Sequence, residues 1–248
     1  MENIVFIPRK SVELVIGAGN RTFYTQTHKS FFIGLIKTGR VRLIVGDDIR
    51  ELSDGMCYMI PPDTETSMYP ITPYHYLTVC LKSPFGGLLE VVDCANLAYE
   101  VSMEFCRLCD AFLHTGDENL FVNGILSLFW PERLFVKPED KKNKTEFISD
   151  AIRYIENHLS DDVMVKDIAK AICVSQFHMC RSFKIQMRVP PKQYILQEKI
   201  RMVKKRLLSG ETSVALSSEF GFSSQSHMCS VFRRLMSISV SDYLKNVL

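Results

Sequence analysis

A segment near the end of the chain repeats one that lies 49 residues earlier, and this repeat restricts the possible folds more than any other feature. HMCRSFK at 178–184 corresponds to HMCSVFR at 227–233. Upstream, Cys173 corresponds to Gly221 at an offset of 48, so the second copy has gained one residue at this point. Two copies of this length indicate a duplicated subdomain and not a solenoid. The offset of 49 relates three further pairs, Ser175 with Ser224, Pro191 with Val240 and Tyr194 with Tyr243.

Each copy has the pattern of two short helices joined by a tight turn. In the first copy, Ile168 and Ala169 lie on an apolar stripe before the turn, and Ser175 is placed to cap the helix that follows. Gly221 suits the turn of the second copy because glycine accepts a positive φ without penalty, whereas Cys173 occupies the matching position less comfortably. The pattern predicts two helix–turn–helix units.

The second helix of each unit buries one stripe and leaves the rest of its surface free. Gln, Ser and His side chains can hydrogen-bond to base edges in the major groove, and Arg and Lys near helix ends can contact phosphates. Charge supports the same partner, since residues 171–234 hold 11 Lys/Arg and only 3 Asp/Glu. A basic block of this kind indicates a polyanion such as DNA, and less often a membrane surface. A solvated helix face is the alternative interpretation.

The stretch 194–209 between the units predicts one long helix with an apolar face and a basic face. Its sixteen residues span about 24 Å at about 1.5 Å each. A spacer of this length could present two recognition helices about one DNA turn, or about 34 Å, apart. The apolar positions are Ile195, Ile200, Val203 and Leu207, and the basic ones are Lys204, Lys205 and Arg206.

The N-terminal half has a different pattern. Residues 31–62 contain β-branched and aromatic runs broken by turn signals every 8–10 residues, which predicts an antiparallel sandwich or barrel over about 1–85. Apolar residues at helical spacing follow over about 88–134, and the polar, lysine-rich stretch 136–146 reads as a linker. We therefore expect an N-terminal domain at 1–135 and a helical domain at 147–248.

The C-terminal pattern resembles the AraC/XylS family of bacterial transcription regulators, whose signature is a double helix–turn–helix of about 100 residues. The departures are Cys173, Arg188 and Ser237 at three usual glycines, Val240 at a usual proline and Ser217 at a usual alanine. The matching positions are Ile168-Ala169, Val174-Ser175, Arg181-Ser182-Phe183-Lys184, Pro191, Tyr194, Leu207-Leu208, Gly221 to His227, Phe232-Arg233 and Tyr243.

The resemblance implies that both recognition helices enter the major groove of double-stranded promoter DNA. Ser230 stands where the family often has arginine, so we expect the first helix, with Arg181, to read its site more strictly. Together with the basic residues at the helix ends, the expected DNA-contacting residues are Gln176, Phe177, Cys180, Arg181 and Lys184 in the first unit and Ser224, Gln225, Ser226, His227, Cys229, Arg233 and Arg234 in the second.

The N-terminal half resembles the cupin-like sensor domain of the same family, which implies a β-barrel followed by helices that mediate dimerisation. At the four cupin metal-ligand positions this chain has Gln26, His28, Phe32 and Thr66, and one imidazole cannot build a first-row metal site. We expect no metal, no cofactor and no catalytic residues. A small effector could bind among Phe6, Phe23, Phe31, Ile33, Val45 and Tyr58, although strand alternation does not say which of these point inward.

The fold prediction is therefore an α+β chain of two domains, a cupin-like antiparallel β-barrel with flanking helices and an all-α double helix–turn–helix. We expect a cytoplasmic homodimer without membrane segments, with RNA polymerase as an open candidate partner. Three alternatives stay open: a regulator that acts through protein contacts with weakened DNA binding, a cupin enzyme with a helical accessory domain, and a DNA-repair methyltransferase fused to such a domain. The single CxxC, Cys106 and Cys109, lies in a helical apolar pattern and reads as core.

Overall fold

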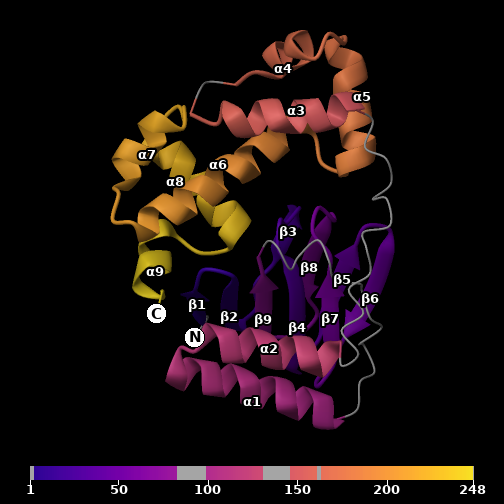
Figure 1. Cartoon of the computed structure of the whole chain (residues 1–248), viewed down its shortest axis with the longest axis vertical. Helices are drawn as coiled ribbons and strands as arrows, with labels where there is room; N and C mark the ends of the chain where they lie inside the picture. Colours follow the sequence, from indigo (N-terminus) through magenta and orange to yellow (C-terminus); the bar gives the residue numbers. More distant parts are fainter. Residues whose placement is uncertain (1–2, 83–98, 131–145, 161–162, 248) are drawn as a thin grey trace. The chain divides into compact units, whose positions relative to one another are not determined.

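The computed structural model describes residues 3–82, 99–130, 146–160 and 163–247 (Figure 1). These residues form two compact units. The predicted linker at 136–146 lies outside the described residues except at its last position, so the domain boundary stays a prediction. The first unit holds the described residues in 3–22, 28–130 and 246–247, and the second holds those in 23–27 and 146–245.

The strands pair into two antiparallel sheets, as the turn spacing predicted. The first sheet has the order β1-β2-β9-β4-β7 and the second the order β3-β8-β5-β6. The strands of the first are β1 (Asn3–Pro8), β2 (Val12–Gly19), β4 (Phe31–Thr38), β7 (Cys57–Ile60) and β9 (Tyr74–Leu81). Those of the second are β3 (Phe23–Gln26), β5 (Val41–Val45), β6 (Asp48–Leu52) and β8 (Thr66–Pro70).

Two helices, α1 (Tyr99–Thr115) and α2 (Glu118–Phe129), pack together and cover one face of the first sheet (Figure 1). Phe105 and Phe112 of α1 lie in one core with Phe31 and Ile33 of β4. The sequence left open which way the candidate effector contacts point, and Phe31 and Ile33 face the helices. Side chains alternate along a strand, so Gly34, between Ile33 and Leu35, faces the other side.

Tyrosines lie over glycines on that other face. Gly34 pairs with Tyr58 on one side and with Thr78 on the other. The Tyr58 ring crosses Gly34, and its hydroxyl lies 2.7 Å from the Thr78 hydroxyl. A Cβ at Gly34 would lie 1.9 Å from the Tyr58 ring, so only glycine leaves room for this arrangement. Burial raises the pKa of Tyr58 well above its usual value, which keeps the phenol neutral.

The turn after β1 is held to the start of α2. Asp117 caps α2 by accepting a hydrogen bond from the Leu120 amide at 2.9 Å. Glu118 accepts hydrogen bonds from the Ser11 hydroxyl and amide and from the Lys10 amide. Burial acts to raise the pKa of Glu118, but these hydrogen bonds outweigh it, so the pKa lies below its usual value.

The CxxC cysteines of α1 are part of the core, as predicted. Cys109 is fully buried among the aromatic residues of the first unit, and Cys106 is half-buried against the same core. Burial raises the pKa of both thiols. A thiol kept protonated is a poor nucleophile and a poor metal ligand.

Apart from β3, the described part of the second unit is helical, and its helices follow the predicted repeat (Figure 1). The edge-to-face ring pair Phe183–Tyr194, at 5.4 Å, recurs 49 residues later as Phe232–Tyr243, at 5.5 Å. The two copies thus share core contacts as well as sequence. The helices are α3 (Glu146–Asn157), α4 (Val165–Ala171), α5 (Gln176–Met187), α6 (Pro191–Leu208), α7 (Ser213–Glu219), α8 (Gln225–Met236) and α9 (Val240–Lys245).

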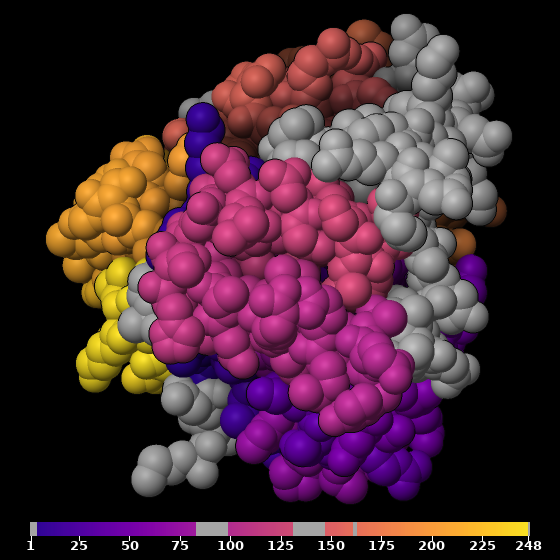
Figure 2. Space-filling view, turned by 60° about the horizontal axis from the view of Figure 1, so that its bottom comes forward, coloured from indigo at the N-terminus to yellow at the C-terminus, as the bar shows by residue number. Residues whose placement is uncertain are grey.

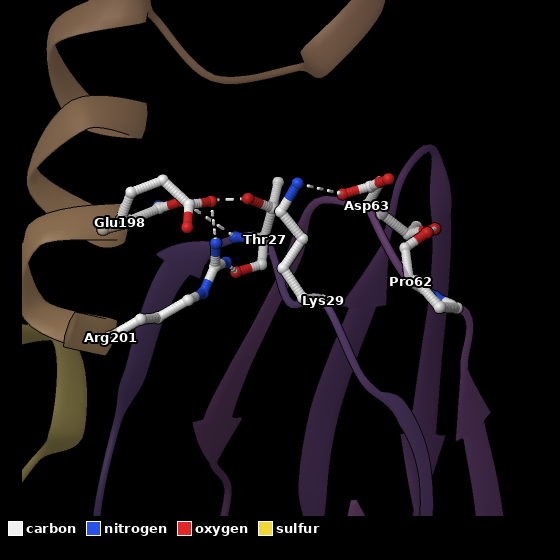
Figure 3. Close-up of polar contacts among 8 residues, drawn as sticks. Thr27, Lys29, Pro62, Asp63, Glu198 and Arg201 are labelled. Atoms are coloured by element: carbon white, nitrogen blue, oxygen red, sulfur yellow. Dashed lines mark hydrogen bonds and ion pairs between the residues drawn. The ribbon is translucent and has the colours of Figure 1, made fainter. Parts of the chain in front are cut away.

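A short N-terminal segment, 23–27, belongs to the second unit through polar contacts with α6 (Figure 3). The Gln197 side chain accepts a hydrogen bond from the Thr27 hydroxyl at 2.9 Å. Arg201 donates to the Thr27 carbonyl and forms an ion pair with Glu198. The Gln193 amide donates to the Thr25 carbonyl at 2.8 Å. No pattern along the chain predicts these contacts, because about 170 residues separate the partners.

The predicted α+β class is confirmed by these two antiparallel sheets and the helical unit. Within the described ranges, no helix has both the length and the apolar character that a bilayer span requires.

Candidate nucleic-acid interface

The turns of the two helix–turn–helix units have the same backbone conformation. Cys173 has φ 55° and Gly221 has φ 60°, both in the left-handed region. The Val174 amide donates to the Ala169 carbonyl at 3.0 Å, and 48 residues later the Phe222 amide donates to the Ser217 carbonyl at 2.9 Å. The left-handed residue ends the first helix of each unit, because it lets the amides that follow donate hydrogen bonds to the last carbonyls of the helix. The prediction of a turn at Cys173 and Gly221 is confirmed.

The extra residue of the second copy is Ser223, which stands between the turn and the cap. Ser175 accepts a hydrogen bond from the His178 amide at 3.2 Å, and Ser224 accepts one from the His227 amide at 3.0 Å. The N-cap predicted at Ser175 is therefore confirmed, and Ser224 caps the second copy in the same way. The two second helices, α5 and α8, thus begin from equivalent caps despite the insertion.

Helices α5 and α8 also end alike. Arg188 follows α5 with φ 59°, and Ser237 follows α8 with φ 55°. Each is a left-handed C-cap, the conformation in which glycine is usual. At these two departures from the family pattern the backbone therefore keeps the left-handed conformation that glycine usually adopts, although the residue is not glycine.

Helix α5 presents a free, positively charged face. It has no acidic residue, and Met179, Phe183 and Met187 are its buried positions. Gln176, Phe177, Arg181 and Lys184 are exposed, and within the described residues no hydrogen bond or ion pair engages the side chains of Gln176, Arg181 and Lys184. Four of the five side chains predicted to contact DNA are thus available on one helix.

Cys180 is the exception among the predicted contacts of α5. It is half-buried and packs against the core formed by α3, α4, α5 and the start of α6. Its thiol therefore contributes to packing in its own unit, and it is less accessible than its neighbours. In the second unit Cys229 is likewise only half-exposed. Sequence spacing missed this because both cysteines lie at the edge of the buried stripe.

Helix α8 presents fewer free polar groups than predicted. The Gln225 amide donates to the Ser213 hydroxyl at 2.7 Å, and the His227 ring lies 3.0 Å from the Ser223 hydroxyl. Phe222 packs edge-to-face against the same imidazole at 5.7 Å. Two of the predicted base-reading side chains are therefore held by their own unit. The exposed side chains of α8 without such a contact among the described residues are Ser226, Ser230, Arg233 and Arg234.

The spacer helix α6 has the predicted apolar face, because Ile195, Ile200, Val203 and Leu207 are all buried. Its basic face differs from expectation at two positions, since the Lys204 ammonium lies over the Tyr243 ring, 5.8 Å from its centroid, and Arg206 is paired with carboxylates. Arg206 forms ion pairs with Glu211 and, at 2.9 Å, with Glu219. Hydrogen bonds from Arg206 to these two carboxylates raise the pKa of the guanidinium further above its usual value. Arg206 therefore holds α6 to the start and end of α7 and is not a free cation.

The residues at the four cupin metal-ligand positions lie in or beside the strands of the N-terminal half. His28 packs against Phe32 with ring centroids 4.2 Å apart, and the Thr66 hydroxyl donates to the Thr64 carbonyl at 3.3 Å. Over the part of the chain that the structure describes, no three His, Cys, Asp or Glu side chains gather as a metal site would require.

Comparison with known proteins places the repeat in a family. A family described as "Helix-turn-helix domain" matches residues 168–246, which include both units. The chain is 24% identical over 232 residues to the probable transcriptional regulator LumQ of Photobacterium leiognathi, covering 90% of this chain and 92% of the relative. These similarities confirm that the chain resembles regulators of the AraC/XylS type.

Another curated relative matches only part of this chain, whereas solved structures of one protein match nearly all of it. The regulatory protein PocR of Salmonella typhimurium is 27% identical over 111 residues, which is 44% of this chain and 35% of that protein. A ToxT variant from Vibrio cholerae, solved in its apo form, has the same fold over 98% of this chain and 100% of its own, with a TM-score of 0.66 and 14% identity. ToxT has also been solved bound to an unsaturated fatty acid, with a TM-score of 0.60, 14% identity and coverage of 98% of this chain and 96% of its own.

Proposed function

We propose that this chain regulates transcription by binding promoter DNA in a sequence-specific manner, with α5 and α8 as the reading helices. The observation that carries the proposal is the duplicated helix–turn–helix whose reading helices lack acidic residues and display free side chains of arginine and lysine. Neutral polar and apolar groups on such a face suit base edges, and the cations suit phosphates.

The two units differ in how much sequence they can read. Arg181 of α5 is exposed and free of contacts among the described residues, and its planar guanidinium can pair with a guanine through two hydrogen bonds. The equivalent residue of α8 is Ser230, and the neighbouring Gln225 and His227 are held within the unit. These contacts support a first unit that selects bases and a second unit that contributes mainly phosphate contacts through Arg233 and Arg234.

A selection from randomised duplexes with the full-length chain tests the proposal. Affinity for the enriched duplex, measured by fluorescence anisotropy, should fall steeply between about 50 and 200 mM salt, because cations that neutralise phosphates release counterions. Arg181→Ala should relax base preference at one position by about 1–3 kcal/mol. Ser230→Ala, the matched change in the second unit, should leave preference unchanged.

Three results would contradict parts of this proposal. Failure to enrich any sequence at either salt concentration would leave the regulator that acts through protein contacts as the better account. An unchanged base preference in Arg181→Ala would assign Arg181 to a phosphate. A loss of preference in Ser230→Ala equal to that in Arg181→Ala would remove the proposed difference between the units.

The outer face of α1 supports a homodimer as the second part of the proposal (Figure 2). Tyr99 and Met103 are 73% and 51% exposed, and Cys106 and Leu113 continue the same stripe at steps of three and seven residues. This spacing is typical of helices that pair along an apolar seam. In an antiparallel pair centred on Cys106, Tyr99 lies opposite Leu113 of the second copy, so the stripe is complementary to itself.

Met103→Glu tests this dimer. The side chain is exposed, so the change should leave the fold intact and convert a dimer to a monomer in sedimentation velocity. Ile49→Glu is the matched control, because Ile49 is also exposed, at 63%, but lies on β6. Mild oxidation should link two chains through Cys106, and Cys106→Ser should abolish that product. A monomeric wild-type chain, or a dimer unaffected by Met103→Glu, would contradict the proposed interface.

An effector is the third part of the proposal. The same fold in ToxT holds an unsaturated fatty acid, which makes unsaturated fatty acids the first class to test here. The test is a thermal shift of the purified chain with an unsaturated fatty acid against the corresponding alcohol. Stabilisation by the acid alone supports a carboxylate ligand, and no shift with either compound argues against this class.

A further inference from the structure

Phe177 is the most exposed large hydrophobic side chain in the described part of the molecule. It lies in the first turn of α5, and 77% of its surface is accessible. The core of its unit does not use it, since α5 is anchored by Met179, Phe183 and Met187. A bare phenyl ring on the reading face therefore calls for an explanation outside the fold of the unit.

The repeat shows that the fold does not require an aromatic residue at this position. Phe177 corresponds to Ser226 in the second copy, at the offset of 49. Ser226 is also exposed, and the serine cap and the left-handed turn residue before it recur in both units. The aromatic ring is thus a feature of the first reading helix alone.

The surroundings of Phe177 favour a nucleic acid over an apolar protein surface. Arg181 lies on the same face one turn later, at i+4, and the exposed Lys184 follows. The next exposed apolar residue is Ile185, which is 61% exposed but lies beyond Arg181 in the last turn of α5. Recognition helices contact base edges mainly through their N-terminal residues, which include Phe177 and Arg181 and leave Ile185 out.

The major groove offers one apolar group to such a ring, the C5 methyl of thymine. We infer that Phe177 selects a thymine by packing against this methyl, close to the base pair that Arg181 contacts. Four residues of helix rise about 6 Å, and base pairs are about 3.4 Å apart, so the two contacts fall about two base pairs apart. This inference rests on the proposed DNA-reading function and names one base that the first unit recognises.

Single replacement of each thymine by deoxyuridine in the enriched duplex tests the inference, because this change removes only the methyl group. One position, about two base pairs from the one that Arg181→Ala relaxes, should bind the full-length wild-type chain about fourfold more weakly, as expected for losing one buried methyl. Phe177→Ala should bind thymine and deoxyuridine equally at that position. Ser226→Ala, the matched variant in α8, should keep the fourfold difference. Circular dichroism checks that both variants are folded.

The possible outcomes separate this inference from the function on which it depends. Failure to enrich any duplex refutes sequence-specific binding and the thymine contact with it. Enrichment followed by equal affinity for deoxyuridine at every position refutes the thymine contact alone. A uracil-sensitive position that persists in Phe177→Ala also refutes it. If Phe177→Ala keeps this sensitivity but abolishes promoter activation in a reporter assay, the ring serves a protein partner instead.

Discussion

Exchanging the residues of the two equivalent turns should change stability in opposite directions. Cys173 and Gly221 have nearly equal φ values, 55° and 60°, and the same pattern of amide hydrogen bonds follows each of them. Both are exposed. Cys173→Gly therefore removes a strained side chain from the first turn with little loss of packing, and Gly221→Cys places the same side chain in the second turn.

The magnitude follows from the backbone alone. A residue with a Cβ in the left-handed region lowers the free energy of unfolding by about 1–2 kcal/mol. Glycine avoids this strain but lowers the free energy of unfolding by about 0.5–1 kcal/mol, because it gives the unfolded chain more conformational entropy. The net gain for Cys173→Gly is about 0.5–1 kcal/mol, and Gly221→Cys should lose a similar amount. For a unit of about 100 residues, 1 kcal/mol corresponds to roughly 4–8 °C in Tm.

Urea unfolding under reducing conditions, followed by circular dichroism at 222 nm, measures both changes. The slope of the unfolding free energy against urea should stay constant, so that a shift in midpoint reports stability. The double variant should return to the wild-type midpoint, because the sites lie in different copies and act independently. A midpoint for Cys173→Gly at or below that of the wild type, with Gly221→Cys also lowered, would show that the Cys173 side chain stabilises the turn and would refute the strain argument.

Two further predictions concern the first unit. Gly34→Ala should lower the free energy of unfolding by about 2–3 kcal/mol in thermal melts, because the added Cβ displaces the Tyr58 ring and breaks its contact with Thr78. Tyr58→Phe is the control, and it should lower the free energy of unfolding by only about 1 kcal/mol, because it removes the hydroxyl and keeps the ring. Because the folded pKa of Glu118 is lowered, its stabilisation is complete above the unfolded pKa, about 4.3, and is lost as the pH falls through the lower folded value. Glu118→Gln should therefore be less stable than wild type at pH 6 and should lose less stability on acidification to about pH 3. If the free energies of unfolding of the two proteins ran parallel with pH, the role of the Ser11 hydrogen bonds would be contradicted.

Much of the helical unit could be predicted from the chain itself. The offset of 49 located both units, both capping serines and the paired rings, because caps, turns and buried stripes depend on residues only a few positions apart. Even the departures from the family pattern were informative. Cys173, Arg188 and Ser237 stand where glycine was expected, and each adopts the left-handed conformation for which glycine is suited.

The availability of individual side chains could not be predicted in this way. Gln225 and His227 were expected to contact bases, but Gln225 bonds to Ser213 on the preceding helix and His227 to the inserted Ser223. Arg206 was expected on a basic face and is paired with Glu211 and Glu219. A polar side chain binds whichever partner the packing of helices brings near, and sequence spacing within one helix carries no information about that partner.

The sequence by itself thus determined the two-part architecture, the duplication and the backbone of both turns, since local steric and hydrogen-bonding preferences act at short range. The tertiary structure decided which face of β4 meets the helices, which cations stay free, and that 23–27 joins the helical unit through Gln193, Gln197 and Arg201. These outcomes depend on contacts between residues far apart in the chain, which form only once the core has brought its elements together.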